Sequence, residues 1–212
     1  LWTPAKGIVT CSREENSDLF WATAGGVGLT GIILYATLRL RPVASAYVKV
    51  EYKRCANLNE ALEAMAANDD AYRYSVAWID CLASGSALGR SVLMHGNHAE
   101  LSDLSEKQKQ HPYQLPKRPK LAVPIDFPAC MLNQYSVKAF NALFYAKNRS
   151  ASGIIVDYDK YFYPLDGVHQ WNRMYGKKGF IQYQATFPFE NRVGLVKMLE
   201  RLSASGRASY LA

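Results

Sequence analysis

The stretch Tyr47-Val-Lys-Val-Glu-Tyr-Lys53 decides the fold of most of this chain of 212 residues. Apolar and charged side chains alternate along it, with Val48, Val50 and Tyr52 on one face and Lys49, Glu51 and Lys53 on the other. Because successive strand residues point to opposite sides of a sheet, this alternation predicts a strand with one buried face.

The segments that follow predict further strands and helices around it. We expect helices over 57–67, 137–147, 165–175 and 190–202, and strands over 72–80, 90–95, 154–162, 180–187 and, after a turn at Gly206, 208–212. Residues 99–130 are polar and proline-rich, which predicts a long excursion without regular sheet structure, either a lid or a disordered segment. This order predicts an α+β domain, an antiparallel sheet with helices on one face.

The first 43 residues have a different character. We expect a strand and polar turn over 1–16, a short helix capped by Ser17-Asp18, and a strand over 32–40 that Pro42 ends. A domain boundary near residue 43 divides the chain into domains 1–43 and 44–212. The N-terminus, which lacks Met, is expected to be cut from a longer polypeptide, and the second domain to be incomplete at its C-terminus.

The composition is that of an ordinary globular protein, with 49% hydrophobic and 20% charged residues. The net charge of +7 suits phosphate, nucleic acid or an anionic membrane surface, without choosing among them. Four cysteines without Cys-x-x-Cys spacing favour free thiols in a reducing compartment. With no signal-peptide pattern and no run long enough to span a bilayer, we expect a cytoplasmic protein, at the membrane surface if its partner is lipid.

The run Gly25-Gly-Val-Gly-Leu-Thr-Gly31 lets backbone approach a flat or anionic ligand closely, since glycine has no Cβ. The alternative is a tight turn. Its Gly-x-Gly-x-x-Gly spacing follows a predicted helix and leads into a predicted strand, the reverse of the dinucleotide fingerprint, so a Rossmann domain is disfavoured.

The predicted strand over 180–187 places Gln182 and Gln184 on one face, where their amides suit sugar hydroxyls. The alternative is a solvent-facing strand surface. Trp78 can stack on a ring ligand or lie in the core. Arg173 can bind phosphate or be a solvated charge near a helix end.

Metal binding and common hydrolase chemistry are disfavoured. His95 and His98 resemble a metal pair, but no third ligand has suitable spacing. The chain has no P-loop, Gly-x-Ser-x-Gly or His-Glu-x-x-His motif. Lys117-Arg-Pro-Lys120 reads as a solvated loop or as a contact for anionic lipid headgroups.

Six segments in order resemble the decaprenylphosphoryl-ribose oxidase family, within the flavoproteins of the vanillyl-alcohol-oxidase type. They are Leu19-Phe-Trp-Ala-Thr-Ala-Gly-Gly-Val-Gly-Leu-Thr-Gly-Ile-Ile33, Tyr74-Ser-Val-Ala-Trp-Ile-Asp80, Leu88-Gly-Arg90, Tyr163-Pro-Leu-Asp166, Trp171-Asn-Arg173 and Gly179-Phe-Ile-Gln-Tyr-Gln184. Each segment is weakly informative alone, and the six in order are specific.

The resemblance implies that residues 1–43 end an FAD-binding domain and that the rest is a substrate domain covering the flavin. It places Gly25, Gly26, Gly28, Gly31 and Ile33 along FAD. It matches Trp78, Arg173, Gln182 and Gln184 with pocket-lining residues. The implied reaction oxidises the ribose 2-hydroxyl of a polyprenyl-phosphate sugar by hydride transfer to FAD, and a partner NAD(P)H-dependent keto-sugar reductase completes an epimerisation in cell-wall polysaccharide biosynthesis.

The sequence also departs from that family. The aromatic-aromatic-His-Pro-Leu-Asp run reads Tyr161-Phe162-Tyr163-Pro164 here, so Phe162 or Tyr163 stands near the place of the pocket tyrosine. The phosphate-cradling N-terminal half and the C-terminal segment that carries a lysine and a cysteine are absent. We therefore identify no catalytic residue and expect this piece alone to be inactive and to lose FAD. The alternatives are a flavin oxidase of a soluble alditol or aldonolactone and a basic nucleic-acid-binding α+β module, which Gln182 and Gln184 disfavour.

Overall fold

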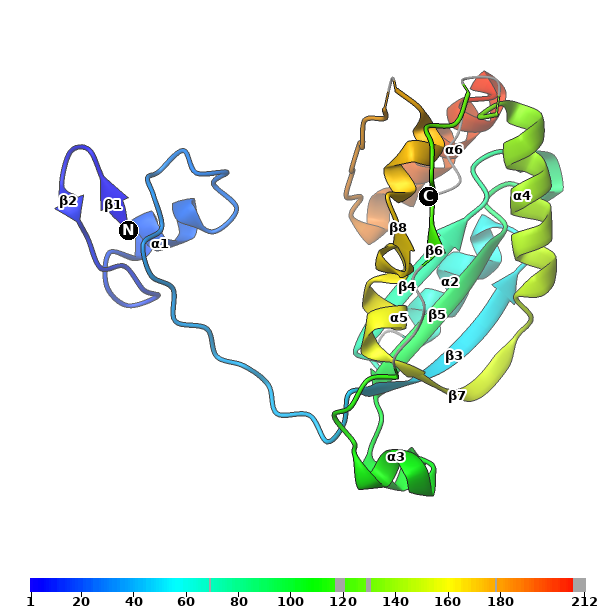
Figure 1. The fold of residues 1–212 in the computed structure, drawn as a ribbon. Coiled ribbons are helices and arrows are strands. Elements are labelled where there is room, and N and C mark those ends of the chain that lie inside the picture. Colours follow the sequence, from blue (N-terminus) through cyan, green and yellow to red (C-terminus); the bar gives the residue numbers. More distant parts are fainter. Residues whose placement is uncertain (69, 117–120, 129–130, 178, 208–212) are drawn as a thin grey trace. The chain divides into compact units, whose positions relative to one another are not determined.

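The computed structural model describes residues 1–68, 70–116, 121–128, 131–177 and 179–207 (Figure 1). The chain folds as two compact units, Leu1–Pro42 and Val43–Ala212, and each is described by itself. The assignment of these units to a flavin domain and a substrate domain stays a prediction.

The first unit holds little regular structure. Strands β1 (Trp2–Thr3) and β2 (Gly7–Ile8) pair antiparallel. Helix α1 (Ser17–Thr23) forms as predicted, but Ser17 and Asp18 lie in its first turn and Asn16 is its N-cap, so the predicted capping by Ser17-Asp18 is wrong. The strand predicted over 32–40 is wrong: Ile32 forms an isolated bridge to Trp2, and residues 33–40 are exposed and without secondary structure. A strand needs a hydrogen-bonded neighbour, and no described segment pairs with 33–40.

The second unit is built on a four-stranded antiparallel sheet in the order β4-β5-β3-β7. Its strands are β3 (Tyr47–Cys55), β4 (Tyr74–Ile79), β5 (Ser91–His98) and β7 (Ala151–Asp157). The antiparallel sheet of an α+β fold is therefore confirmed, and the alternation along 47–53 is retained, with Val48 and Val50 fully buried and Lys49 exposed.

One face of the sheet, which we call the α4 face, carries Val48, Val50 and Trp78. Helix α5 (Tyr158–Phe162) covers one part of it, because Tyr161 packs on the cluster of Val48 and Val50. Helix α4 (Gln134–Lys147) covers another part through the rings of Phe144 and Trp78.

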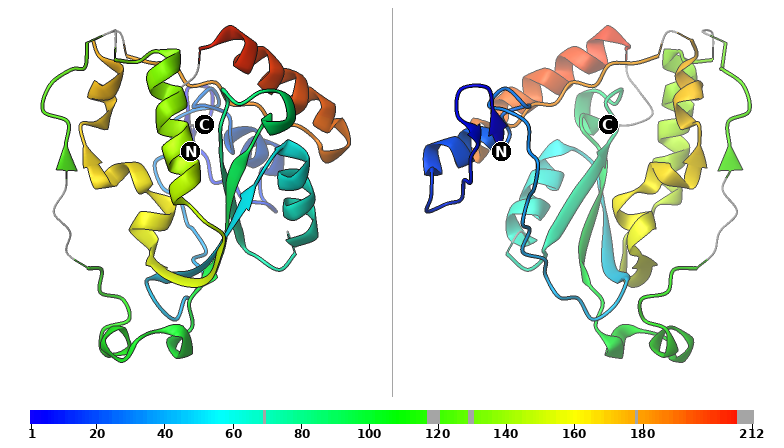
Figure 2. Two further views of the ribbon diagram at one scale, coloured as in Figure 1. Left: turned by 90° about the vertical axis from the view of Figure 1, so that its right-hand side faces the viewer. Right: turned by 60° about the vertical axis from the view of Figure 1, so that its left-hand side comes forward.

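The opposite face, the α2 face, is also covered, so the prediction of helices on one face is wrong (Figure 2). Helix α2 (Leu58–Asn68) packs Ala61 and Ala64 against Cys55 and Leu93. At the Ile79 end of β4 the sheet is apolar on both sides, with Trp78 and Val92 on one face and Ala77 and Leu93 on the other, so each side needs a covering helix. Helix α6 (Arg192–Ser205) extends this layer by packing Leu199 on Leu58.

Local capping explains where several predicted boundaries moved. Helix α4 begins three residues early because Asn133 Oδ1 accepts hydrogen bonds from the backbone N–H groups of Tyr135 (2.8 Å) and Ser136 (3.1 Å). The strand predicted over 154–162 is wrong in its second half, since Asp157 accepts from the backbone N–H of Lys160 at 3.0 Å and starts α5. Gly206 ends α6 with a φ of 64°, which confirms the predicted turn.

The helix predicted over 165–175 is wrong. Two 3-10 helices, η3 (Pro164–Gly167) and η4 (Trp171–Tyr175), replace it, separated by strand β8 (Val168–His169) and by Gln170 at a φ of 56°. Between 99 and 130 the described residues hold η2 (Leu101–Asp103), α3 (Glu106–Gln110) and β6 (Leu121–Ala122), which pairs parallel with β8. The expected excursion with little sheet structure is therefore confirmed in the described part.

Other predicted features have mixed outcomes. The strand expected over 208–212 and the basic cluster 117–120 lie outside the described residues. Cys11, Cys55 and Cys81 are free thiols, as expected, and Cys130 lies outside the described residues. Two further 3-10 helices complete the structure, η1 (Gly85–Ala87) and η5 (Phe189–Asn191).

Candidate functional site

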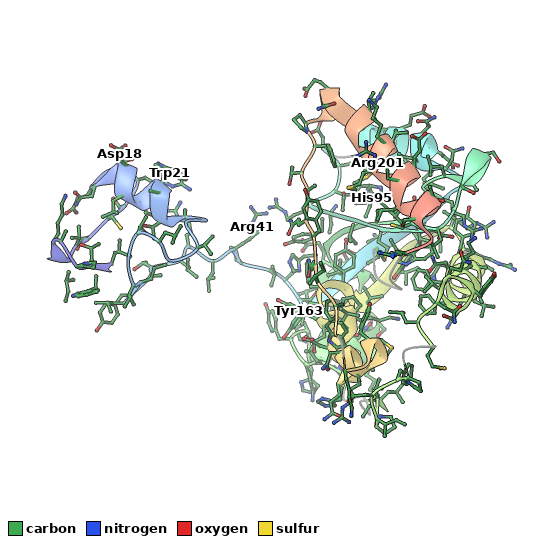
Figure 3. All side chains as sticks on the ribbon, turned by 90° about the horizontal axis from the view of Figure 1, so that it is seen from above. Asp18, Trp21, Arg41, His95, Tyr163 and Arg201 are labelled. Atoms are coloured by element: carbon green, nitrogen blue, oxygen red, sulfur yellow. The ribbon has the colours of Figure 1, made fainter. Side chains whose placement is uncertain are left out.

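An aromatic cluster forms where α5 crosses the α4 face of the sheet. Phe162 is 38% exposed and sets its ring edge-on to Tyr74 at 4.8 Å between centroids and to Tyr161 at 4.9 Å. Tyr163 is 54% exposed at the edge of this cluster (Figure 3). Phe162 and Tyr163, the two candidate substrate residues in the run that departs from the family pattern, thus lie together and offer partly exposed rings.

Tyr161 anchors this cluster to the sheet. Its hydroxyl lies 3.1 Å from the carbonyl oxygen of Met94 and 3.2 Å from that of Tyr74, so it can donate to either of two adjacent strands. The ring lies over Gly96, where an added Cβ would stand 2.8 Å from the ring and from Val48. Burial, with Tyr52 and Tyr74 nearby, raises the pKa of Tyr161 to about 12, so this hydroxyl stays a donor.

A second hydroxyl at the cluster pairs with a histidine. The Tyr74 hydroxyl lies 3.1 Å from Nε2 of His98, whose ring stands edge-on to that of Tyr74. Burial, helped by the nearby charge of Arg73, lowers the pKa of His98 below its ordinary value. The neutral imidazole therefore dominates at neutral pH, and Tyr74 is held from two sides, by His98 and by the aromatic rings.

Trp78 lies in the core of the second unit. It is 8% exposed, and its ring centroid stands 4.6 Å from that of Phe144 on α4. Of the two alternatives for Trp78, a place in the core describes this geometry better than stacking on a ligand. Trp78 nevertheless lies on the same sheet face as Tyr74.

A buried polar network fixes the end of β4 beside Trp78. The Asp80 carboxylate is 2% exposed and accepts from Arg90 Nε at 2.8 Å and Nη2 at 2.7 Å. It also accepts from the side-chain amide of Asn141 at 2.7 Å and the backbone N–H of Leu82 at 3.0 Å. Four donors on one carboxylate give the charge the partners that burial demands, and Asn141 ties α4 to the sheet.

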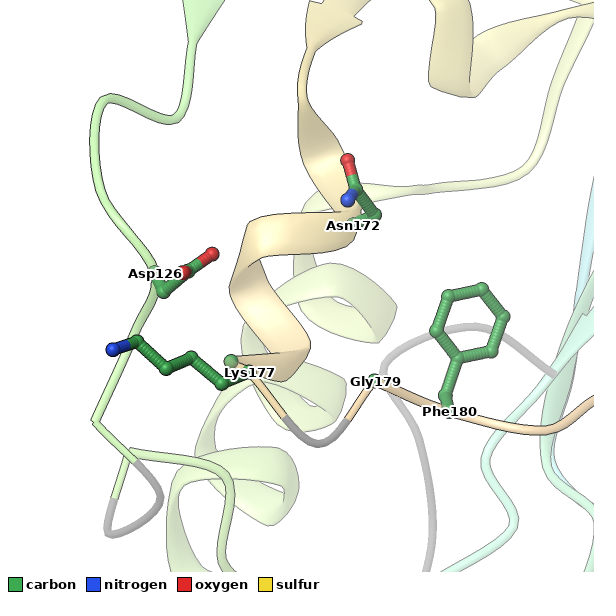
Figure 4. Close-up of a pocket in the computed structure, with 6 residues that line it drawn as sticks. Asp126, Asn172, Lys177, Gly179 and Phe180 are labelled. Carbon is green, nitrogen blue, oxygen red and sulfur yellow. The ribbon is translucent and has the colours of Figure 1, made fainter.

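Arg173 is engaged with backbone. Its Nη1 donates to the carbonyl oxygens of Pro124 at 2.6 Å and Val123 at 3.2 Å, so it fastens η4 to the proline-rich excursion. An open pocket of about 520 Å³ adjoins η4 (Figure 4). It is lined by Asp126, Asn172, Gly176, Lys177, Gly179 and Phe180.

Gln182 and Gln184 are not on a strand, so the strand predicted over 180–187 is wrong in this structure. Residues 179–186 are exposed and without secondary structure, including Ile181 at 96% and Tyr183 at 84%. A lone segment cannot form a strand, and no described strand pairs with this one. The structure therefore does not bring the two amides together with Trp78, and their role stays a prediction.

The glycine-rich run in the first unit leaves its backbone open at Gly25 and Gly28 but not at Gly26, where an added Cβ would stand 2.1 Å from the Ala22 carbonyl oxygen. Gly25 and Gly28 adopt φ values of 82° and 77° with no heavy atom within 4 Å of an added Cβ. Gly31, in contrast, packs tightly, since a Cβ would stand 2.3 Å from the Trp2 carbonyl oxygen. Beside the open glycines, Val27 and Leu29 are 92% and 91% exposed, and Ile33 is 59% exposed. This combination of accessible backbone and apolar side chains fits a flat, partly anionic group such as FAD.

The two histidines that resemble a metal pair each contact an aromatic residue. His95 has its Nδ1 3.0 Å from Ser75 Oγ and its ring 5.0 Å from that of Tyr72, and His98 pairs with Tyr74. Among the described residues, no group of three His, Cys, Asp or Glu side chains is placed to hold a metal ion. Within the same part of the chain, no helix combines the length and apolarity needed to cross a bilayer.

Comparison with known proteins places this chain beside oxidoreductases. It is 34% identical over 197 residues, 92% of its length, to decaprenylphosphoryl-beta-D-ribose oxidase of Mycolicibacterium smegmatis. It is 35% identical over 121 residues to a Streptomyces coelicolor protein described as an uncharacterized protein in the mprA 5′ region. It is 38% identical over 69 residues, 32% of its length, to cytokinin dehydrogenase 4 of Oryza sativa subsp. japonica. No family model matches the chain.

The class that these matches define is that of the FAD-linked oxidoreductases. Within that class, the resemblance read from the sequence is confirmed, since the chain is decaprenylphosphoryl-ribose-oxidase-like along nearly all of its length. The chain spans 43% of the length of that relative and 32% of the Streptomyces protein, so the activity of the whole protein is a proposal.

Proposed function

We propose that the protein containing this chain is an FAD-dependent oxidoreductase that oxidises a sugar hydroxyl, the ribose 2-hydroxyl of a polyprenyl-phosphate sugar. The observation that carries this proposal is the 34% identity over 92% of the chain to decaprenylphosphoryl-beta-D-ribose oxidase, which extends over both units. The sugar specificity and the lipid come to this chain from that relative's name.

The two units divide the work in this proposal. The open glycines Gly25 and Gly28 bring backbone close to FAD, while exposed apolar side chains from Val27 to Ile33 contact its ring system. Bound FAD supplies an acceptor for the hydride that leaves the carbinol carbon.

The second unit binds and orients the sugar in this proposal. Partly exposed rings at Phe162 and Tyr163 offer stacking surfaces. Behind them the ring of Tyr74 is held by the hydrogen bond to His98 and by edge-on contact with the Tyr161 ring. The amides of Gln182 and Gln184 hydrogen-bond the sugar hydroxyls once their segment is paired as a strand. A preorganised pocket of this kind lowers the barrier by holding the carbinol in one orientation.

The product and the surroundings follow from the same proposal. Oxidation leaves a keto sugar, and an NAD(P)H-dependent reductase as partner would return it to the epimeric alcohol. A substrate with a polyprenyl chain places the reaction at a membrane surface, on the cytoplasmic side. A soluble alditol or aldonolactone is the alternative substrate, and the lipid in the relative's name favours the polyprenyl phosphate. A nucleic-acid-binding module is less compatible, because α4 and α5 cover aromatic side chains of the sheet.

The spectrum of the protein at the length of its relatives tests this function. We expect flavin bands that bleach without oxygen on addition of a polyprenyl-phosphoryl ribose and persist with an alditol or an aldonolactone. Residues 1–212 alone should purify without stoichiometric flavin, because the chain spans 43% of its relative. A colourless full-length protein would refute the proposal, and bleaching by the alditol alone would transfer it to the alternative substrate.

Gln184 provides a sharper test of the sugar site. In the full-length protein, Gln184→Ala should lower turnover about fivefold or more, since a hydrogen bond to a sugar hydroxyl contributes about 1 kcal/mol. Flavin content and the unfolding midpoint should stay unchanged, because Gln184 is exposed in this structure. Gln110→Ala, at an exposed glutamine of α3, is the matched control. Equal turnover in both variants would remove Gln184 from the site.

A further inference from the structure

Helix α4 lies over the sheet (Figure 2, left), and an apolar stripe is exposed on the side of the helix that does not face the sheet. Val137 and Asn141 face inward and are buried. The exposed residues at helical spacing on the other side form what we call the α4 stripe: Tyr135, Ala139, Ala142, Leu143 and Ala146. Tyr135 is 75% exposed and Leu143 is 72% exposed, whereas outward helix positions of a globular protein are ordinarily polar.

The stripe is bordered by positive charge alone. Lys138 lies along one side of it and Lys147 along the other, and both are exposed. Neither lysine forms an ion pair within the described part of the chain. Arg149 is the second residue after the helix and is also positively charged.

Helix α4 and the segments on either side of it carry no acidic residue. No Asp or Glu occurs between Asp126 and Asp157 in the sequence. The carboxylate that α4 does contact, Asp80, is buried and already paired with Arg90. The chain therefore presents a helix about 21 Å long, from 14 residues at 1.5 Å each, with an apolar centre and cationic margins.

We propose that the α4 stripe with Lys138 and Lys147 is an interfacial surface that lies on an anionic lipid bilayer. An apolar helix face bordered by lysines matches the boundary between acyl chains and negative headgroups, and a tyrosine suits the polar side of that boundary. Three of the five stripe residues are alanines, whose short side chains leave the centre of the stripe flat. The proposal deepens the proposed function by naming the surface through which the protein would reach a lipid-linked sugar.

Vesicle sedimentation with residues 1–212 tests this surface without reference to catalysis. We expect binding to phosphatidylcholine vesicles containing one third phosphatidylglycerol, and at least tenfold weaker binding to pure phosphatidylcholine. Each lysine near an anionic surface contributes about fivefold, so the variant with Lys138→Gln and Lys147→Gln should bind roughly 25-fold more weakly. Leu143→Gln should weaken binding several-fold at any salt concentration, because it removes apolar contact rather than charge.

A matched control separates this face from net charge. Lys197→Gln with Arg201→Gln on α6 removes the same two charges from another exposed helix surface and should change vesicle binding less than threefold. Every substituted side chain is exposed, so all variants should fold, and circular dichroism checks this. Equal loss in both double variants, or no vesicle binding at all, would overturn the proposal. So would a concentration-dependent dimer in analytical ultracentrifugation that Leu143→Gln dissociates, since the stripe would then join two copies. Vesicle binding without any flavin chemistry would sink the proposed function alone.

Discussion

Asn141 should be one of the most sensitive positions of the second unit. Its side-chain amide donates to the buried Asp80 carboxylate at 2.7 Å, and this bond joins α4 to the end of β4. Asn141→Ala deletes the donor and leaves the carboxylate with Arg90 and the backbone N–H of Leu82. Because Asn141 is 2% exposed, water cannot easily take the place of the lost amide donor.

The magnitude follows from two opposing effects. A hydrogen bond to a charged group contributes about 1.5–3 kcal/mol, and truncation also leaves a small cavity worth roughly 1 kcal/mol. Against this, the Asn141 Oδ1 is buried without a hydrogen-bond partner, and its removal relieves about 1 kcal/mol of desolvation. The expected loss in the free energy of unfolding is therefore about 2 kcal/mol.

Urea unfolding of residues 1–212 measures this loss. With a slope of about 2 kcal/mol per molar urea, the midpoint should fall by about 1 M. Asn148→Ala, which loses only a local bond from the end of α4 to the Phe144 carbonyl oxygen, is the control and should cost about 0.5 kcal/mol. A loss below about 0.5 kcal/mol in Asn141→Ala would refute the reasoning.

Asn141→Asp distinguishes the electrostatic part of this account from the steric part. The substitution keeps the shape of the side chain but places a second carboxylate beside Asp80. Repulsion and burial raise the pKa of the new carboxyl in the folded state above its unfolded value. Its stability contribution is then present at low pH and lost as pH rises, so the variant should be most impaired at neutral pH and recover below pH about 4. A pH-independent deficit would point to packing instead.

Three further predictions concern other parts of the chain. Gly96→Ala should lower the free energy of unfolding by about 1–3 kcal/mol, measured by urea, because its Cβ would collide with the Tyr161 ring; an unchanged midpoint would mean that the ring moves freely. Burial, with the Asp80 charge nearby, raises the pKa of the Cys81 thiol to about 11, so iodoacetamide at pH 8 should label Cys81 only after unfolding, as mass spectrometry can show. Trypsin should cut first after Arg39, in an exposed segment without secondary structure, and an early cut elsewhere would contradict the two-unit division.

Periodicity predicted the elements whose apolar pattern is satisfied by neighbours within this chain. The strand at β3 and the helices α2 and α6 lie close to where the sequence places them, because their buried sides meet partners such as Leu93 and Leu58. Capping chemistry moved boundaries by a few residues, as Asp157 did at the start of α5.

Two of the failed predictions, both of strands, share a physical cause. The segments 32–40 and 180–187 carry strand-like patterns, but a pattern describes a preference, and a strand also needs a hydrogen-bonded neighbour. The candidate site was only partly predictable. The aromatic run Tyr161-Phe162-Tyr163 is visible in the sequence, whereas the positions of Gln182 and Gln184 depend on strand pairing that residues 180–187 do not make in this structure.

Some of the polar architecture could not be read from spacing. Asp80 and Arg90 lie in segments that resemble known oxidases, yet the third member of their network, Asn141, is 61 residues further on and looks like any helix asparagine. The pairing of Tyr74 with His98, 24 residues apart, also depends on the fold, because β4 and β5 must first align antiparallel. Only the folded sheet brings such residues into contact.

The close approach of Tyr161 to Gly96 has a consequence for how sequences of this kind can diverge. A larger residue at position 96 and a tyrosine at position 161 compete for the same space, although the two positions are 65 residues apart in the chain. A Cβ added at Gly96 would stand 2.8 Å from the Tyr161 ring. Position 96 cannot take a larger residue without expelling the Tyr161 ring that bridges two strands. In an alignment of relatives, substitutions at these two positions should therefore appear together, with a smaller side chain at 161 wherever 96 is not glycine, and this pair should register as a contact in covariation analysis.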